Sequence, residues 1–260
     1  MRVIEERLVP GVGTLWWSRV DVQGRAARGD GPERESQAHR SFVIPADGSA
    51  DLILRDDELL VAGPSTRAIH ARGGAGGVTV GLRFAPGAAG VALAQNAAPL
   101  RDGQLAGAAV LTPAQCRAAR DLLRRVRDGA AAEGGADRAS RVRHIERAFA
   151  PEIAAHAGWH AAVRRAAARG HAAHQLAAEL GYSERQLRRR MTEHFGYGFA
   201  SLRRVVRAER ALALLRAGWA PGRVAAQSGY ADQAHLTRDF VALVGATPGQ
   251  LAVYAAGSAA

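Results

Sequence analysis

Two sets of hydrogen-bonding side chains lie near the C-terminal end of the chain, each at helical spacing. With successive helix residues about 100° apart, one set points away from the apolar face of each helix. The first set is Arg185, Arg188, Arg189 and Thr192, and the second is Gln233, Ala234, His235, Thr237 and Arg238. Arginine can donate two hydrogen bonds to guanine, glutamine can pair with adenine, and the threonine methyl can contact thymine. These residue types suit contacts with base edges in duplex DNA.

Each set lies in one copy of a repeated pattern: a short helix, a turn containing glycine, and a longer helix. Gly181-Tyr182 matches Gly229-Tyr230 at an offset of 48, and the apolar positions that follow match at an offset of 49. The matched apolar positions are Leu187, Met191, Phe195 and Leu202, then Leu236, Phe240, Val244 and Leu251. A repeat that keeps turn glycines and apolar positions is one structural unit used twice. We predict helix-turn-helix units at about 172–195 and 221–244.

The sequence also indicates where one of these helices begins and which residues lie beside the packed faces. Ser183-x-x-Gln186 is a capping box, which predicts where the longer helix of the first unit begins. Arg190, Glu193 and Asp239 flank the packed faces, and we expect them to be ordinary solvated positions.

An amphipathic segment from Phe199 to Gly218 connects the two units. Its apolar positions at Leu202, Val205, Leu212 and Leu215 predict one continuous helix. Such a helix would hold the units at a fixed separation. Recognition helices about 34 Å apart reach successive major-groove turns, so one chain could read a long site without a dimer.

The charge of the chain fits a nucleic-acid partner without requiring one. The 260 residues carry a formal net charge of +11, and residues 161–260 hold 14 Arg against 6 Asp and Glu. Basic excess in one domain is typical of nucleic-acid binding. All basic residues other than histidine are arginine, so a codon-biased genome or a solvated arginine-rich helix face would explain the excess equally well.

The bulk composition is that of a soluble globular protein. Hydrophobic residues make up 48% and charged residues 23%. No apolar run approaches the roughly 18 residues of a membrane span, and the N-terminus lacks a signal-peptide core. A single cysteine, Cys116, excludes an internal disulfide framework, and we expect it to carry no chemistry. We predict a cytoplasmic protein with no membrane partner.

The first part of the chain reads as strands followed by a helix. Short β-branched or aromatic segments separated by turn residues predict a small antiparallel sheet or barrel. These segments are 14–22, 40–44, 50–55, 58–63 and 77–84. A short helix is expected over 86–96, and a longer one over 112–129 with Thr112 as its cap. The predicted class is α+β: a β-rich regulatory domain at 1–127, a Gly/Ala-rich linker at 128–140, and an all-α domain at 141–260.

The helical part resembles the DNA-binding domain of the AraC/XylS family of bacterial transcription regulators, over about residues 159–254. The motifs that carry the resemblance are Leu176-AAELGYSERQLRRRM, Arg207-AERALALLRAG and Val224-AAQSGYADQAHLTRDF, followed by GATPGQL. The resemblance implies seven helices with two helix-turn-helix units. It places base contacts on Arg185, Arg188, Arg189, Gln233, His235, Thr237 and Arg238. Departures are Met191 in place of an aromatic, Ala234 in place of a polar residue, and Leu251-Ala252 where Tyr-Arg is common.

The N-terminal part, over about residues 5–110, resembles the regulatory domain of a group of actinobacterial regulators of this type. The segments that carry this resemblance are Ile44-PADGSADLILRDDELLVAGPSTRA and Val80-GLRFAPGAAG. It implies a cupin-like β domain that binds a small effector or mediates dimerisation.

A metal-dependent enzyme fused to the DNA-binding part is the alternative for the N-terminal domain. His39 and His70, with Asp47 and Asp51, could ligate a metal in a cupin-like barrel, but they lack a close His-x-His spacing. Asp47-Gly48 is most simply a turn. The Trp16-Trp17 pair could line a ligand pocket, although core packing explains at least one of them. We therefore predict no metal, no cofactor and no enzymatic activity.

The helical part is open to three further interpretations. The histidines could form a pH or metal sensor, but a solvated helix face explains them; they are His144, His156, His160, His171 and His174. Alkyl-transfer DNA repair needs a reactive cysteine and, in one version, a four-cysteine zinc site, which one cysteine does not supply. An architectural DNA protein is disfavoured by two distinct sets of outward side chains.

These observations favour a sequence-specific DNA-binding transcription regulator. Its expected partners are double-stranded operator DNA, a small-molecule effector sensed by the N-terminal domain, RNA polymerase, and a second copy of the chain.

Overall fold

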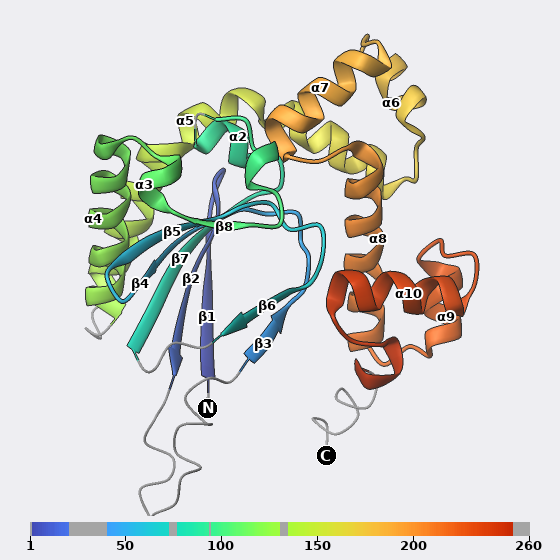
Figure 1. Cartoon of the computed structure of the whole chain (residues 1–260), viewed down its shortest axis with the longest axis horizontal. Helices are drawn as coiled ribbons and strands as arrows, with labels where there is room; N and C mark the ends of the chain where they lie inside the picture. The colour runs from blue at the N-terminus through green and yellow to red at the C-terminus, as the bar shows by residue number, and fades with distance from the viewer. Residues whose placement is uncertain (1, 21–40, 73–76, 94, 131–134, 252–260) are drawn as a thin grey trace, which may run out of the picture.

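The computed structural model describes residues 2–20, 41–72, 77–93, 95–130 and 135–251. Figure 1 shows two parts side by side: a β-sheet covered by helices, and a group of helices that carries the C-terminal end of the described chain. The α+β class predicted from the sequence is confirmed, with the antiparallel sheet first and the helical part second.

The larger sheet has six strands, all antiparallel, in the order β1-β2-β7-β4-β5-β8. Its strands are β1 Arg2–Val9, β2 Gly13–Val20, β4 Asp51–Arg55, β5 Glu58–Ala62, β7 Gly77–Phe84 and β8 Gln104–Ala106. A second sheet pairs β3 Ser41–Ile44 with β6 Ile69–Arg72. Each of the five predicted strand segments overlaps an observed strand. The strands β1, β6 and β8 were not predicted.

Alternating burial explains how the sheet packs. In β4 the side chains of Leu52 and Leu54 are buried while their neighbours are half-buried, the period-two pattern of a strand with one face on the core. The hairpin from β4 to β5 turns at Asp56 and Asp57, whose φ angles are 49° and 65°. Two left-handed residues suit the twist of a tight hairpin, and this dipeptide lies between two of the predicted strand segments.

Helices cover the buried face of the sheet. The helix α4, Pro113–Ala130, places Leu122, Leu123 and Val126 in the same core as the sheet. Thr112 caps α4, since its hydroxyl accepts from the Gln115 N–H at 3.3 Å. Cys116 is buried in this core.

The short helices before α4 differ from the expected helix over 86–96. The helix α2 covers only Ala89–Ala92, a 3₁₀ turn covers Ala98–Leu100, and α3 covers Gly107–Val110. Gly87, with φ of 93°, lies against Phe195 and His160, so the chain is still turning there.

The helix α5, Gly135–Ala168, corrects the predicted linker at 128–140. Because α4 continues to Ala130, only residues 131–134 separate the two helices, and they lie outside the described residues. The linker was predicted from the glycines between 128 and 140, but the alanine and arginine residues that follow them favour a helix. Ile145 and Ile153 of α5 pack in the core of the sheet, whereas Val163 packs among the C-terminal helices. One helix therefore contributes to both cores, and the division into two domains stays a prediction.

The C-terminal part continues with five helices. They are α6 Ala173–Glu179, α7 Glu184–Phe195, α8 Phe199–Arg216, α9 Pro221–Gln227 and α10 Gln233–Val244. Residues 248–251 are again helical. Within the described ranges, no helix is both long and apolar enough to cross a membrane.

Candidate nucleic-acid interface

The first helix-turn-helix unit consists of α6 and α7. Gly181, with φ of 67°, makes the turn between them in a backbone conformation that favours glycine. The predicted capping box is present: the Gln186 N–H donates to Ser183 Oγ at 3.2 Å, and the Ser183 N–H donates to Gln186 Oε1 at 2.8 Å. The predicted face of Leu187, Met191 and Phe195 is buried. Local sequence thus sets both the start and the orientation of α7.

The second unit, α9 and α10, repeats this geometry. Gly229 takes φ of 77° in the turn, and Asp232 caps α10 by accepting from the His235 N–H at 2.6 Å. The side chains of Leu236, Phe240 and Leu243 are buried against α9 and α8. The long helices of both units end at a left-handed glycine, Gly196 and Gly245. The repeat predicted from the sequence is therefore a repeat of structure.

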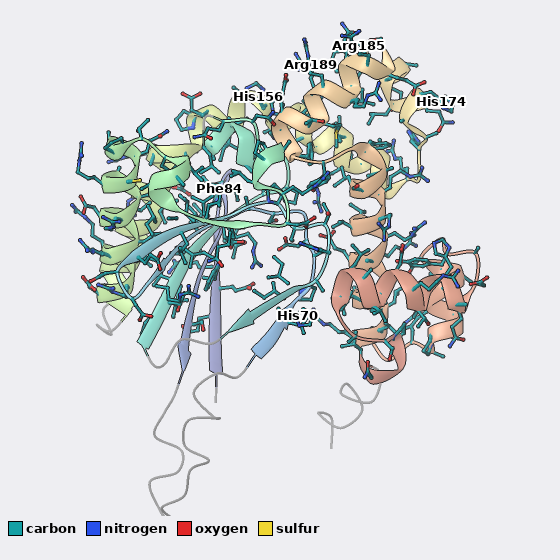
Figure 2. The ribbon with its side chains drawn as sticks, in the orientation of Figure 1. His70, Phe84, His156, His174, Arg185 and Arg189 are labelled. Atoms are coloured by element: carbon teal, nitrogen blue, oxygen red, sulfur yellow. The ribbon has the colours of Figure 1, made fainter. Side chains whose placement is uncertain are left out.

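The predicted base-reading residues lie on the sides of α7 and α10 that face away from their cores. Arg185, Arg188, Arg189, Gln233 and Arg238 are exposed, and His235 and Thr237 are half-buried. Figure 2 shows Arg185 and Arg189 on the outer side of α7, away from the sheet. Three of these residues have local contacts. The Thr237 hydroxyl donates to the Gln233 carbonyl at 2.9 Å, Arg189 lies 3.7 Å from Glu193, and His235 packs edge-on against Tyr230.

Asp239 is not the solvated position that the sequence suggested. Its side chain is buried, accepting hydrogen bonds from Arg204 Nη2 at 2.9 Å and from Arg207 Nη2 at 3.0 Å. Burial alone would raise the pKa of Asp239, but the hydrogen bonds and charges of these two arginines hold it below its usual value. The Arg207 guanidinium also lies 4.4 Å from the centre of the Tyr230 ring. This clamp fixes α10 on α8.

The clamp was missed because Asp239 lies at the edge of the packed face, where helical spacing alone cannot distinguish solvent from a neighbouring helix. Its partners stand 32 and 35 residues earlier. The other two flanking residues differ from it: Glu193 is exposed, as expected, and Arg190 lies over the Tyr182 ring at 5.1 Å.

The connecting segment is one helix, as predicted. The 18 residues of α8 form a rod of about 27 Å at 1.5 Å per residue. Leu202 packs in the core of the first unit, and Val205 and Leu215 pack in the core of the second. A single rigid element therefore joins the two units (Figure 1).

Both recognition helices end against the N-terminal part. The Ala46 and Ala68 N–H groups donate to the carbonyls of Leu243 and Ala242, at 2.7 and 2.9 Å, near the end of α10. The Ala97 N–H donates to the Glu193 carbonyl near the end of α7, at 3.2 Å. Helix C-termini carry unsatisfied carbonyls, so these donors stabilise the contact. The N-terminal turns, which usually enter a DNA groove, face away from the sheet.

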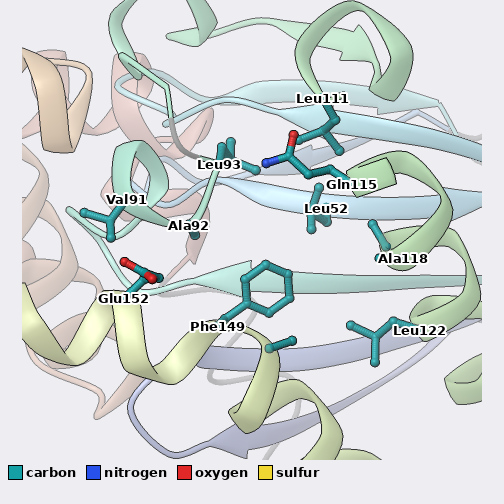
Figure 3. A pocket seen from close by; sticks show the side chains of 12 residues that line it. Leu52, Val91, Ala92, Leu93, Leu111, Gln115, Ala118, Leu122, Phe149 and Glu152 are labelled. Carbon is teal, nitrogen blue, oxygen red and sulfur yellow. The ribbon is translucent and has the colours of Figure 1, made fainter. Parts of the chain in front are cut away.

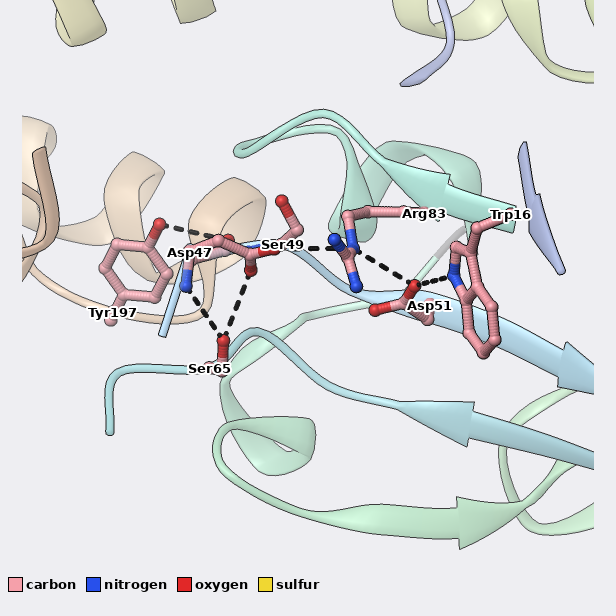
Figure 4. A network of polar contacts seen from close by, with 8 residues as sticks. Trp16, Asp47, Ser49, Asp51, Ser65, Arg83 and Tyr197 are labelled. Atoms are coloured by element: carbon pink, nitrogen blue, oxygen red, sulfur yellow. Dashed lines mark hydrogen bonds and ion pairs between the residues drawn. The ribbon is translucent and has the colours of Figure 1, made fainter. Parts of the chain in front are cut away.

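A polar network stands where the sequence offered metal ligands (Figure 4). Arg83 Nε lies 3.3 Å from both Asp47 Oδ2 and Asp51 Oδ1, and the Trp16 indole donates to Asp51 at 2.7 Å. Burial raises the pKa of Asp51, with Arg83 opposing that effect. The Tyr197 hydroxyl donates to the Gly48 carbonyl at 3.1 Å and links this loop to the end of α7.

These contacts do not favour a metal site. Both carboxylates are committed to Arg83, and His70 is exposed on β6. His39 lies outside the described residues. Within the part of the chain that the structure describes, no group of three or more ligating side chains is arranged to hold a metal. Trp16 lies across the backbone of Gly81 and Trp17 packs on the core, so neither lines the cavity described below.

The histidines only partly match the expected solvated face. His160 is buried, and its Nε2 lies 3.1 Å from Nδ1 of His194, while His156 packs edge-on against His194. Burial, with His194 and His156 adding repulsion, lowers the pKa of His160 from 6.5 to about 4. His171 lies 3.1 Å from Glu179, and His174 is exposed; the side chain of His144 lies outside the description.

We expect acid to destabilise the protein through His160. In the folded state His160 binds a proton less readily than in the unfolded chain. Its contribution to the free energy of unfolding is therefore fully present above pH 6.5 and is lost as the pH falls from 6.5 towards about 4. The loss should be on the order of 2 kcal/mol. Urea unfolding at pH 7 and pH 4.5 would measure it, and His160→Gln should reduce the pH dependence. His174→Gln is the control.

Other titratable and charged groups near His160 can also contribute to the pH dependence of stability. Besides His156 and His194, Arg190 and Glu193 act on His194 from α7. A pH dependence that is unchanged in His160→Gln would assign the acid sensitivity to other groups.

Comparison with known proteins agrees with this geometry. A family model described as a helix-turn-helix domain matches residues 176–252. No curated protein matches the chain in sequence. Together with the two units, this match makes the chain a DNA-binding regulator that binds DNA through residues 176–252. The match bears out the helix-turn-helix part of the resemblance to the AraC/XylS family, over these residues alone.

Solved structures with an overall likeness include ToxT from Vibrio cholerae. One ToxT structure is 11% identical, with a TM-score of 0.41, and the match covers 84% of this chain and 94% of that chain. ToxT of strain O395 bound to (E)-4-(8-methylnaphthalen-1-yl)but-3-enoic acid is 13% identical, with a TM-score of 0.41, covering 83% and 90%. A likeness at this level carries no argument about ligands.

Proposed function

We propose that this protein is a sequence-specific transcription regulator whose two recognition helices read one stretch of duplex DNA. The main observation behind this proposal is that α8 joins two similar helix-turn-helix units. These units expose arginine and glutamine side chains on α7 and α10. Side chains of this kind near a helix N-terminus suit base-edge contacts in the major groove. Arg185, Arg188, Arg189, Gln233, His235, Thr237 and Arg238 would make them.

The two units would contribute differently. The first presents three arginines, which bind phosphate and guanine, and the second presents mixed donors and acceptors. We therefore propose that the first unit supplies more of the affinity and the second more of the selectivity. In vitro selection of bound DNA with the full chain tests this: it should yield one long, non-palindromic site. Enrichment of no sequence would contradict the proposal.

The N-terminal part would regulate this binding in the cytoplasm, as a cupin-like domain of the actinobacterial type that senses a small molecule or mediates dimerisation. Its backbone contacts to the ends of α7 and α10 support this role, because any movement of the sheet part would move both recognition helices. RNA polymerase would be the partner at the promoter.

DNA binding should depend steeply on salt. Each phosphate neutralised by an arginine contributes a slope of about −0.9 to log K against log salt. If several of the exposed arginines contact phosphate, binding should fall by roughly tenfold or more between 50 and 200 mM salt. Fluorescence anisotropy with the selected duplex measures the slope. Arg125→Ala, an exposed arginine of α4 on the sheet part, should leave it unchanged.

A further inference from the structure

We propose that the cavity between the sheet and the helices α2, α4 and α5 binds an apolar molecule bearing a protonated amine, and that its occupation is transmitted through α5. This proposal rests on the regulatory role proposed above. The cavity has a volume of about 520 Å³. That size falls in the range of small-molecule sites.

The walls of the cavity are mostly hydrocarbon. Leu52 of β4, Leu93 after α2, and Leu111 and Leu122 around α4 surround it, with Phe149 of α5 across from them (Figure 3). Phe149 is held in place by an edge-on contact with Phe84, at 5.3 Å between ring centres. A ligand would therefore bury a mainly apolar body here.

Two polar side chains from different helices line the cavity. Glu152 of α5 is exposed, and among the described residues it has no ion-pair or hydrogen-bond partner. The Gln115 side-chain carbonyl of α4 accepts from the Thr112 N–H at 2.9 Å, and its amide nitrogen points towards Leu93 (Figure 3). A free carboxylate beside apolar walls favours a cationic group, and the amide can donate to an acceptor on the ligand.

The helix that forms one wall also reaches the DNA-binding part. Ala148, Phe149 and Glu152 lie on both sides of Pro151, which stands inside α5. An interior proline lacks the N–H that would bond to the preceding turn, so the helix bends most easily there. Further along the same helix, Val163 and Ala166 pack in the core of the first helix-turn-helix unit. A ligand pressing on this turn would tilt α7.

Three probes of equal chain length separate the head groups: decylamine, decanol and decanoate. Isothermal titration calorimetry on the full chain, below the concentration at which the probes form micelles, should give the tightest binding for decylamine. We expect decylamine to bind about 5-fold more tightly than decanoate, since one exposed ion pair contributes little. Equal or tighter binding of decanoate would overturn the assignment of a cationic ligand.

Matched variants place the binding in this cavity. Glu152→Gln should remove the preference for decylamine, whereas Glu146→Gln on the same helix should keep it. Ala118→Trp, at an exposed position of α4 that lines the cavity, should abolish binding of all three probes. Ala114→Trp, one turn earlier and outside the lining, is its control. Unchanged binding in Ala118→Trp would place the probes elsewhere and overturn the proposal.

Transmission is tested on the selected DNA duplex. Saturating decylamine should change the DNA affinity of the full chain by about 5-fold or more. Pro151→Ala should bind decylamine normally but show a smaller change, because a regular helix bends less. Binding of the amine without any change in DNA affinity would overturn the transmission. Failure to bind DNA without the amine would count against the proposed function, and the calorimetric test of the cavity would still stand.

Discussion

Replacing Arg238 with alanine should weaken binding of the full chain to its selected DNA by about 1–3 kcal/mol and relax the preference at one base position. Arg238 is exposed on α10, on the side opposite the buried Leu236 and Phe240. Its guanidinium has no competing ion pair among the described residues, so it is available for two hydrogen bonds to a guanine.

The measurement compares the selected duplex with versions changed at each position and with random DNA. Arg125→Ala on α4 is the matched control and should change neither affinity nor selectivity. An equal loss on selected and random DNA would make Arg238 a phosphate contact, since phosphate contacts carry no sequence information.

Replacing Asp239 with alanine should destabilise the helical part by about 1–3 kcal/mol. The change leaves Arg204 and Arg207 without the carboxylate that both now bond. The loss should fall short of that for a fully buried pair, because the side chains of these arginines are 46% and 25% exposed. Urea unfolding followed by circular dichroism measures it.

Two other variants give this result its meaning. Asp239→Asn keeps an acceptor and should lose less than Asp239→Ala. Glu193→Ala removes an exposed acid of α7, whose side chain lies 3.7 Å from that of Arg189, and should change stability by less than about 0.5 kcal/mol. Equal losses in Asp239→Ala and Glu193→Ala would show that the clamp adds nothing.

The two helix-turn-helix units were predictable because their signals are local. Gly181 and Gly229 mark the turns, Ser183 and Gln186 form the cap, and apolar residues recur at helical spacing. The longer helices therefore end where the predicted units end, at 195 and 244, and α7 begins directly after its predicted cap. The outward faces follow from the same periodicity, although DNA contact by those residues stays a prediction.

The features that the sequence did not predict depend on distant partners. Asp239 is paired with arginines of another helix, and Asp47 with Arg83. The backbone N–H groups of Ala46 and Ala97 donate to the recognition helices, and residue types do not predict such backbone hydrogen bonds. The strand β1 was not predicted because its sequence lacks the alternation of polar and apolar residues that is typical of a strand. Consecutive residues in it are exposed, Glu5 and Arg7 among them.

The shared helix α5 has a consequence for protein engineering. It packs against the sheet through Ile145 and Ile153, and further along it packs in the first helix-turn-helix unit through Val163. Each inserted residue rotates everything beyond it by about 100°, whereas seven residues rotate it by only about 20°. In chimeras joined through this helix, regulation of DNA binding should therefore depend on the number of residues inserted into α5. Regulation should return when whole heptads are inserted, and it should not decline steadily with added length.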